Sequence, residues 1–423
     1  MLGSLSMSKT IFLAAGRSSR MKPLSDKNFL DFCGEPLILR LLKNAQKGGL
    51  KNFVIVGNED NKDKIKEICS HNEFLQNAVV TIQTNLDEGM AGGITEGLKF
   101  IEDDEGVTIL GGNDYVNHEI YREIIEQSKD LNGGILAKKV TEYFPGGYLS
   151  LNKEENITGI VEKPGEGNEP SDVVNIIVHH FNQSKDLKSA LNQAQSSEDD
   201  VYEVALDALF KSGKYKAVEY DDYWQAIKYP WHVLQLMDLL LHQDPKELLG
   251  DRISEFEEVA PSIWIHKTVG GKTIFSGSNI ILDEKVRPYH NVCISGPAYI
   301  GPYTTLGNNC LVRNSIIGKN CCVGYNTEIA RSYLANGVTS HIAYIGDSVV
   351  DSEVNFGAYS CAANLRLDKQ TVQVKIKDQR IDSKMEKLGA IVGAGAQIGI
   401  HAALMPGAKV EVDEFIPPHS MKK

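Results

Sequence analysis

The sequence lacks a long apolar run. None of its 423 residues falls in a stretch approaching the roughly 20 consecutive apolar residues that cross a bilayer. It also lacks a leader in which a charged segment precedes an apolar one, and Met1 to Ser6 looks like a vector remnant before a start at Met7. We therefore expect a cytoplasmic protein with no membrane partner.

The sequence is also poor in paired cysteines and in net positive charge. Its seven cysteines form no C-x-x-C pair, so we expect reduced, buried thiols instead of a metal cluster or disulfides. A net charge of −12 argues against nucleic acid as a partner. A phosphate site is still compatible with this charge, because it needs only a local group of donors.

What the sequence does have is a six-residue repeat in its second half. Aliphatic residues return at every sixth position, first at Ile294, Ile300, Leu306 and Val312, and later at Val392, Ile398, Leu404 and Val410. This period fits neither a helix nor a single strand, and it is typical of a parallel β-helix whose aliphatic side chains fill the core. The repeat is interrupted between about residues 365 and 387, where 370–377 alternates like an exposed hairpin.

The first half alternates strand-like and helix-like patterns. Short apolar stretches occur at 10–14, 53–57, 79–83 and 107–110, with helical spacing between most of them. This order predicts an open, largely parallel sheet with helices on both faces and ligands at the carboxyl ends of its strands. We expect a first domain at 7–241, a charged linker at 242–258 and the repeat domain at 259–423.

A short loop led by small residues and one glycine follows the first strand. Its residues are Leu13, Ala14, Ala15 and Gly16, and Arg20 comes shortly after them. Such a loop presents backbone N–H groups to phosphate oxygens, and an arginine adds a fork of further donors. The loop matches neither the P-loop pattern nor the G-x-G-x-x-G spacing, so it predicts a phosphate site of another type.

At these residues the chain resembles the sugar-1-phosphate nucleotidylyltransferases, whose motif is close to L-A-A-G-x-G-T-R followed by P-K. The resemblance implies an α/β, Rossmann-like nucleotidyltransferase domain in which Arg20 and Lys27 are catalytic. It also implies that Asp114 binds Mg²⁺. The residues that it assigns to nucleotide binding are Leu13, Ala14, Ala15, Gly16, Gln83 and Gly89. Those that it assigns to the sugar phosphate are Gly147, Glu162, Lys163 and Asn175.

The implied reaction is attack by a sugar phosphate oxygen on the α-phosphorus of a nucleoside triphosphate, with release of pyrophosphate. The resemblance favours UTP. No covalent protein nucleophile is needed, because catalysis depends on positioning and charge neutralisation.

One position departs from the family. The second metal-ligating aspartate is expected at residue 226, which is alanine and cannot ligate. Three readings stay open: Mg²⁺ held by Asp114 with phosphates and water, a replacement ligand such as Asp222 or His232, or a weakened or lost first activity.

A second candidate site lies within the repeats. The segment from His341 to Asp347, with Asn364 and the stretch from Lys387, resembles bifunctional enzymes that also acetylate an amino-sugar 1-phosphate, most closely the archaeal type. The resemblance implies an all-β, left-handed parallel β-helix that forms homotrimers. His341 would be the general base for attack of the amine on acetyl-CoA, because histidine exchanges protons near working pH.

The same resemblance assigns further residues to the second site. Tyr344 and Asn364 would hold the sugar phosphate or the amine, while Gly357 and Ala358 would contact acetyl-CoA. The family's phosphate-binding lysine is replaced by Val338. Phosphate recognition is therefore expected from another cation, such as Arg313 or Arg331.

Several functions remain open at this point. The first is a bifunctional enzyme that forms a UDP-N-acetylamino sugar. The second is a nucleotidyltransferase whose β-helix only assembles or regulates. The third is an acetyltransferase whose nucleotide domain is degenerate, or serves as a sensor.

Overall fold

The structure is a computed structural model that describes residues 8–198 and 200–423. The vector remnant expected at Met1–Ser6 lies outside the described residues. Contacts divide the chain into two compact units, one made of 8–17 with Ile38–Trp224 and the other of Ser18–Leu37 with Gln225–Lys423. The domain boundaries expected from the sequence stay a prediction. Within the described residues, none of the helices is both long and apolar enough to cross a membrane.

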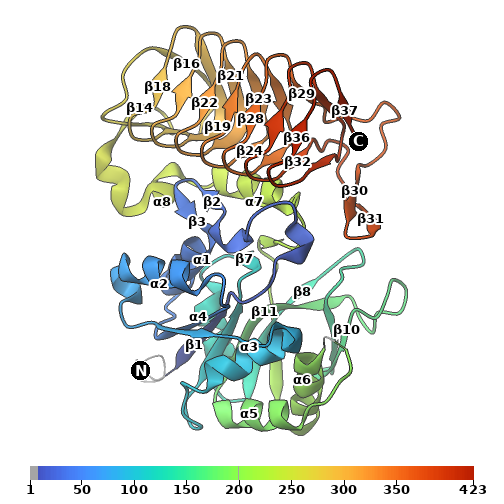
Figure 1. The fold of residues 1–423 in the computed structure, drawn as a ribbon. Helices are drawn as coiled ribbons and strands as arrows, with labels where there is room; N and C mark the ends of the chain where they lie inside the picture. Colours follow the sequence, from blue (N-terminus) through green and yellow to red (C-terminus); the bar gives the residue numbers. More distant parts are fainter. Residues whose placement is uncertain (1–7, 199) are drawn as a thin grey trace. The chain divides into compact units, whose positions relative to one another are not determined.

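The first unit is built on a nine-stranded sheet with the order β10-β9-β11-β6-β1-β4-β5, while β8 pairs with both β11 and β12 (Figure 1). Its strands are β1 (Lys9–Leu13), β4 (Phe53–Gly57), β5 (Val79–Ile82), β6 (Val107–Gly111), β8 (Gly133–Lys139), β9 (Gly147–Leu151), β10 (Ile157–Glu162), β11 (Val173–Phe181) and β12 (Tyr215–Glu219). Its helices are α1 (Leu37–Lys47), α2 (Lys62–Ser70), α3 (Gly89–Leu98), α4 (Ile120–Ser128), α5 (Ser184–Gln193) and α6 (Val201–Ser212).

Half of this sheet is parallel, as the sequence predicts. Strand β1 runs parallel to β4 and β6, and β4 runs parallel to β5. All five residues of β4 are buried, which is expected when helices cover both faces of a parallel sheet. The other half differs, because β11 is antiparallel to β6, β8 and β9. The four strands from β8 to β11 follow one another without a crossover helix, so the sheet is mixed and not largely parallel.

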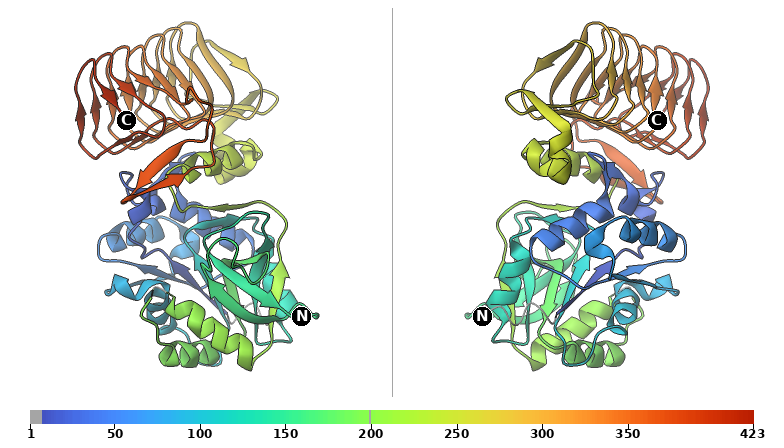
Figure 2. Two further views of the ribbon diagram at one scale, coloured as in Figure 1. Left: turned by 90° about the vertical axis from the view of Figure 1, so that its right-hand side faces the viewer. Right: turned by 90° about the vertical axis from the view of Figure 1, so that its left-hand side faces the viewer.

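The second unit contains a parallel β-helix, and the six-residue repeat is confirmed as its core (Figures 1 and 2). Leu306 pairs with Val323, and Val323 pairs with Ser340, so each position stacks on its counterpart in the next coil. The repeating aliphatic residues are buried, as shown by Ile300 and Leu404, which are both 0% exposed. Many corners are turned by asparagines with positive φ, such as Asn309 (φ 58°) and Asn320 (φ 56°).

The strands of the solenoid belong to two sheets. The smaller contains β18 (Arg287–Pro288), β20 (Thr305–Leu306), β22 (Cys322–Val323), β25 (Thr339–Ser340), β28 (Asn355–Phe356), β33 (Gln397–Ile398) and β36 (Phe415–Ile416). The larger contains β14 (Phe256–Ala260), β15 (Ile263–His266), β16 (Thr273–Ser276), β17 (Ile280–Leu282), β19 (Val292–Ile300), β21 (Leu311–Ile317), β23 (Glu328–Ala330), β24 (Tyr333–Leu334), β26 (Tyr344–Gly346), β27 (Val349–Val350), β29 (Cys361–Ala362), β32 (Ile391–Val392), β34 (Ala403–Leu404), β35 (Lys409–Val410) and β37 (Met421–Lys422).

The predicted interruption is a β-hairpin that leaves the stack of coils (Figure 1). Its strands, β30 (Gln373–Ile376) and β31 (Gln379–Asp382), are antiparallel. An isolated antiparallel β-bridge between Leu365 and Lys387 joins the two ends of the excursion. The coil register continues across it, because Phe356 pairs with Ile398 on the next coil.

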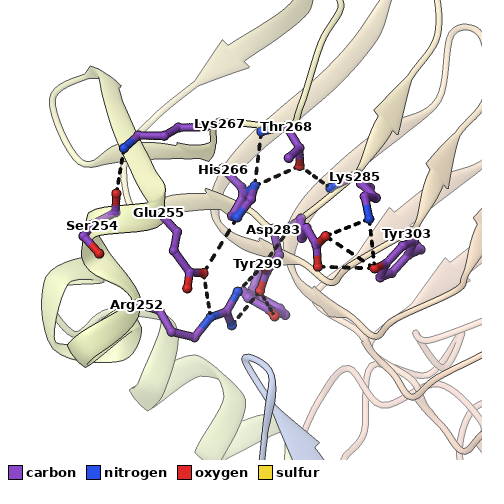
Figure 3. Close-up of polar contacts among 11 residues, drawn as sticks. Arg252, Ser254, Glu255, His266, Lys267, Thr268, Asp283, Lys285, Tyr299 and Tyr303 are labelled. Carbon is purple, nitrogen blue, oxygen red and sulfur yellow. Dashed lines mark hydrogen bonds and ion pairs between the residues drawn. The ribbon is translucent and has the colours of Figure 1, made fainter.

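Before the first coil, the chain folds into a short helix and an ion-pair network. Helix α8 (Pro245–Leu249) leads into a 3₁₀ segment, Gly250–Glu255, which carries Arg252. The Arg252 guanidinium forms an ion pair with the fully buried Asp283, which also accepts a 2.6 Å hydrogen bond from the Tyr299 hydroxyl (Figure 3). This network fastens the chain entering the solenoid to its first coils.

The segment Ser18–Leu37 packs against the solenoid, together with helix α7 (His232–Leu241) of the same unit. The amide of Ser25 donates a 2.6 Å hydrogen bond to the buried carboxylate of Asp351. The ring centroids of Phe32 and Tyr333 lie 5.2 Å apart. The residues that follow the glycine-led loop therefore belong structurally to the solenoid.

Candidate functional site

The glycine-led loop starts where β1 ends, at the carboxyl edge of the parallel strands. Leu13 is in register with Val56 of β4 and Gly111 of β6, and its carbonyl accepts a 3.0 Å hydrogen bond from Gly112. Gly16 is exposed, and a Cβ atom added to it would have no neighbour within 4 Å. In the part of the chain that the structure describes, the amides of Ala15 and Gly16 donate to no protein acceptor. These two N–H groups are therefore available to an anion.

Two buried asparagines hold this loop, and the sequence analysis missed both. Asn58 donates a 2.9 Å hydrogen bond to the Ala15 carbonyl, and Asn61 donates one of 2.9 Å to the Ala14 carbonyl. Asn58 and Asn61 are only 6% and 3% exposed. Because both loop carbonyls are turned toward these side-chain amides, the loop keeps a fixed conformation. The signal in the sequence was two asparagines after strand β4, one directly after it and one three residues later.

Gln83 and Gly89 lie together at the start of α3. The Gln83 side-chain amide donates to the Gly89 carbonyl at 2.8 Å and to the Asn85 carbonyl at 3.0 Å. Glycines let α3 approach closely, because a Cβ on Gly93 would lie 3.1 Å from the Gln83 Oε1 atom and 3.2 Å from the Leu13 Cδ2 atom. The structure thus brings the predicted nucleotide-binding residues Leu13, Gln83 and Gly89 to one end of β1.

Asp114 begins the short strand β7 (Asp114–Val116) just beyond β6. Its side chain is 8% exposed, and its Oδ1 atom accepts a 2.8 Å hydrogen bond from the Trp224 indole. The Trp224 ring also packs on Phe144, with centroids 4.7 Å apart. Trp224 therefore fixes the direction of the carboxylate that the resemblance assigns to Mg²⁺, a role of Trp224 that the sequence analysis did not foresee.

The residues proposed as replacements for an aspartate at position 226 are engaged elsewhere. Asp222 accepts a 2.7 Å hydrogen bond from the Asn117 side chain. The His232 Nδ1 atom accepts from the Lys228 amide at 3.1 Å, and burial lowers the pKa of His232 to about 4. Across the described residues, His, Cys, Asp and Glu side chains form no group of three that could hold a metal ion. This geometry disfavours the replacement ligands and leaves two readings open, namely one carboxylate with phosphates and water, or a weakened or lost first activity.

The predicted sugar-phosphate residues form one cluster on β9, β10 and β11. Gly147 and Glu162 are cross-strand partners, and a Cβ on Gly147 would lie 2.8 Å from the Asn175 Oδ1 atom. The Lys163 ammonium lies 2.6 Å from a Glu162 carboxylate oxygen. The structure thus assembles Gly147, Glu162, Lys163 and Asn175, although their roles stay predictions.

Arg20 and Lys27 lie in the second unit, on the segment that packs on the solenoid. Arg20 is exposed, and its guanidinium carbon lies 5.9 Å from the centre of the Tyr229 ring. Lys27 is half-buried at the start of a 3₁₀ turn, Lys27–Phe29. Asp26, which stands where the family has proline, caps this turn by accepting a 3.1 Å hydrogen bond from the Asn28 amide.

Side chains from successive coils form the polar centre of the solenoid. Asn364 donates one hydrogen bond to the Tyr344 hydroxyl at 3.1 Å and another to the Asp347 carboxylate. Arg331 donates twice to the same carboxylate, at 2.7 and 2.6 Å. Gly346 leaves room for this centre, because a Cβ there would lie 2.5 Å from the Tyr344 hydroxyl. The structure therefore brings Tyr344 and Asn364 together, while their role in holding the sugar phosphate or the amine stays a prediction.

The cations expected to replace the lysine at position 338 are already paired. Arg331 is held by Asp347, and Arg313 lies 2.6 Å from the Glu328 carboxylate. Val338 itself is 1% exposed and packs in the solenoid core. Neither arginine is an open phosphate ligand in this arrangement.

His341 follows β25 directly and is exposed, whereas Gly357 and Ala358 follow β28 on the next coil. The two coils are joined by the hydrogen bond that the His341 amide donates to the Phe356 carbonyl, at 3.1 Å. The three residues thus lie on neighbouring coils after consecutive strands of the smaller solenoid sheet.

Known proteins resemble this chain over nearly its whole length or over its first half. A bifunctional sugar-1-phosphate nucleotidylyltransferase/acetyltransferase of Sulfurisphaera tokodaii is 28% identical, covering 95% of this chain and 94% of its own. The bifunctional protein GlmU of Methanocaldococcus jannaschii is 27% identical, covering 95% of this chain and 91% of its own. A solved structure of apo UDP-glucose pyrophosphorylase has 16% identity and a TM-score of 0.47, covering 54% of this chain and 96% of that chain. The family model described as nucleotidyl transferase matches residues 9–227, more than half of this chain, which therefore belongs to the nucleotidyl transferase family.

Proposed function

We propose that the protein is a bifunctional enzyme of sugar nucleotide synthesis. One activity transfers a nucleotidyl group from a nucleoside triphosphate, with UTP favoured, to a sugar 1-phosphate. The other transfers acetyl from acetyl-CoA to an amino-sugar 1-phosphate, so that the final product is a UDP-N-acetylamino sugar. The observation that carries the proposal is the presence of two separate polar centres, around Asp114 and around Tyr344, in a chain whose full-length relatives are named for both activities.

The first activity would use groups at the carboxyl edge of the sheet. The free amides of Ala15 and Gly16 would bind phosphate oxygens of the nucleotide, while Gln83 would contact its base. Arg20 and Lys27 would neutralise negative charge as the bond from the α-phosphorus to the pyrophosphate oxygen breaks. The cluster of Gly147, Glu162, Lys163 and Asn175 would orient the sugar 1-phosphate.

Asp114 fits a magnesium site with few protein ligands. Mg²⁺ keeps several waters and is usually bound by one or two carboxylates together with substrate phosphates. Asp114 supplies one buried carboxylate whose direction is fixed by Trp224. When bound, the metal would add positive charge beside the phosphates.

The second activity would take place on the solenoid. His341 would accept a proton from the substrate amine, whose nitrogen attacks the thioester carbonyl carbon of acetyl-CoA. The new C–N bond replaces the C–S bond, and the coenzyme leaves as its thiol. Tyr344 and Asn364 would hold the acceptor, and Gly357 and Ala358 would contact the coenzyme. We further propose a homotrimer formed through the solenoid, and a cytoplasmic location.

A coupled assay tests both activities. The protein is incubated with glucosamine 1-phosphate, acetyl-CoA, UTP and Mg²⁺, and free thiol and pyrophosphate are measured separately. Both should be released, and the absence of both would refute the proposal. Thiol release without pyrophosphate would instead support an acetyltransferase with a degenerate nucleotide domain, the alternative that Ala226 favours. Omitting acetyl-CoA and varying the nucleoside triphosphate and the sugar 1-phosphate then defines the nucleotide and the acceptor.

A further inference from the structure

The second unit contains a cavity that is rich in positive charge. Its volume is about 790 Å³, and eight of its fifteen lining residues are lysine or arginine, against one carboxylic acid, Glu411. The chain as a whole has a net charge of −12, so the positive charge around this cavity is opposite in sign to the net charge of the protein. Such an excess in a concave site attracts anions.

Four separate parts of the unit supply the cations. Arg20 and Lys22 come from the segment that packs on the solenoid, and Lys409 comes from strand β35. Lys422 and Lys423 come from strand β37 and the residue after it. The hairpin β30–β31 contributes Lys375 and Arg380, together with Lys377 at its turn. The excursion that interrupts the repeat therefore places cations beside the arginine of the glycine-led loop motif.

The hairpin holds like charges against each other. Lys375 and Arg380 are direct cross-strand partners, an arrangement that destabilises a sheet when no anion lies between the charges. The pKa of Lys409 is lowered, mainly by burial and further by the charge of Lys375, against the opposing effect of Glu411. An anion bound in the cavity would relieve these repulsions.

Few of these cations are neutralised by the protein. Within residues 8–198 and 200–423, Arg20, Lys375 and Arg380 form no ion pair with a carboxylate. Lys422, by contrast, lies 2.5 Å from Glu414 and is paired. The three unpaired cations keep their hydrogen-bond donors available for a ligand.

The hairpin is held firmly enough to act as part of a site. Val374 and Ile376 point away from solvent, with exposures of 0% and 6%. Gly407, at φ +77°, packs against the start of the hairpin, because a Cβ atom there would come 2.8 Å from the Val372 side chain, 2.9 Å from the Gln373 carbonyl and 3.6 Å from the Val374 side chain. The cations on the other face of β30 are therefore carried by a docked element.

We propose that this cavity of the second unit binds a polyphosphate through Arg20 and the cations of the hairpin, and that pyrophosphate, the product of nucleotidyl transfer, is its ligand. The chemical class follows from the density of lysine and arginine around a cavity large enough for several phosphate groups. The choice of pyrophosphate follows from Arg20, to which the proposed function gives a role in the same reaction, and it rests on that proposed function.

Calorimetric titration of the full-length protein with pyrophosphate, in metal-free buffer, tests the proposal. The variant Lys375→Gln/Arg380→Gln should bind pyrophosphate at least about tenfold more weakly, because each lost charge-assisted hydrogen bond is worth about that factor. The matched control is Lys384→Gln/Lys387→Gln, which removes the same charge from two exposed residues of the same excursion that do not line the cavity. The control should bind pyrophosphate like the wild type.

Several outcomes would overturn the proposal. Equal affinity in the wild type and in Lys375→Gln/Arg380→Gln would do so, and so would an equal loss in the control pair. Displacement of pyrophosphate by coenzyme A but not by dephospho-coenzyme A would assign the cavity to the coenzyme's 3′-phosphate and overturn the link to the nucleotide.

Two further measurements separate folding and function from binding. Removing the facing charges should leave the melting temperature of the ligand-free protein unchanged or higher, so a loss of affinity together with a lower melting temperature would count against the proposal. If no sugar nucleotide forms in the coupled assay while pyrophosphate binding depends on Lys375 and Arg380, the proposed function fails and the polyphosphate site stands. If nucleotidyl transfer proceeds and pyrophosphate inhibits the wild type and the Lys375→Gln/Arg380→Gln variant equally, the polyphosphate site fails and the proposed function stands.

Discussion

The two candidate sites are assembled over very different distances along the chain. In the first unit, the Trp224 indole reaches the Asp114 carboxylate across 110 residues. In the solenoid, Asn364 reaches the Tyr344 hydroxyl across 20 residues. A solenoid stacks each coil on the one before it, so neighbours in space are separated by about one coil of the chain. An open sheet instead gathers residues from the ends of strands that are distant in sequence.

This difference explains how each site is held in place. The loop at Gly16 depends on Asn58 and Asn61, two buried amides from another strand end. The solenoid centre depends on Arg331 and Asp347, which occupy successive coils and pair with each other. We therefore expect the two activities to respond independently to substitution.

The largest effect is expected for His341→Ala. Acetyl transfer should fall about a thousandfold, because a positioned general base contributes a factor of that order. Pyrophosphate release should be nearly unchanged, because His341 lies on the solenoid surface. The two rates are measured by thiol and phosphate detection in parallel. Equal loss of both rates would mean that the histidine is structural and that the two sites are not independent.

The reciprocal substitution is Asp114→Ala. Nucleotidyl transfer should fall about a hundredfold, since the carboxylate aligns positive charge with the reacting phosphates. Acetyl transfer should keep its wild-type rate. The matched control is Asp222→Ala, which removes an exposed carboxylate bonded to Asn117, and it should retain nucleotidyl transfer. If the control loses as much activity as Asp114→Ala, Asp222 is the replacement ligand after all.

The ion-pair network at the start of the solenoid should contribute to the stability of the second unit. Asp283→Ala should lower the free energy of unfolding by about 2 kcal/mol, because the buried Tyr299 hydroxyl loses its hydrogen-bond acceptor and the Arg252 guanidinium loses its ion pair with Asp283. Urea denaturation measures this change. Glu284→Ala removes the adjacent but more exposed carboxylate, and it should leave the unfolding midpoint unchanged. Equal midpoints for the two variants would show that burial of Asp283 contributes little.

A further effect on stability depends on pH and concerns the first unit. Burial lowers the pKa of His180 to about 4, below the value near 6.5 in an unfolded chain, so the folded form binds fewer protons. Stability from this residue is therefore present above about pH 6.5 and is lost as the pH falls toward 4. His180→Gln should reduce the pH slope of the unfolding free energy by about 1.4 kcal/mol per pH unit in this window. An unchanged slope in urea titrations between these pH values would contradict the pKa shift.

The histidines of the coils offer a contrast to His180. His290, His341, His401 and His419 are all exposed, whereas His180 is buried. His401→Gln, which changes an exposed ring stacked on His419 with centroids 4.9 Å apart, is therefore the matched control for His180→Gln. An equal change of slope in both variants would mean that the slope does not report on burial of His180.

Much of the fold was predictable because it depends on repeated local patterns. The aliphatic period placed Ile300 and Leu404 in the core, and the break in the period located the hairpin. The strands at the start of the first unit were recognised as apolar stretches followed by turns. The antiparallel half of its sheet was not predicted, because strand direction depends on how the connections cross and not on the composition of each strand.

The candidate sites were predictable in part. The motifs located Asp114, Gly147 and Asn175, but they gave no sign that Trp224 would orient the aspartate or that buried asparagines would hold the loop. The sequence analysis expected Arg313 or Arg331 to bind phosphate, and both turn out to be paired with carboxylates. Such pairings depend on which coil lies above another, and a single sequence does not state this directly.

By itself, the sequence determined the solenoid, its interruption and the order of the motifs in the two halves of the chain. The reason is that periodic burial and turn formation depend on residues that are close together in the sequence. Only the tertiary structure decided that Ser18–Leu37 packs with the solenoid and that the hairpin brings Lys375 and Arg380 to the same cavity as Arg20. The physical reason is that these contacts join segments more than 300 residues apart, as between Ser25 and Asp351, and their formation depends on the path of the whole chain.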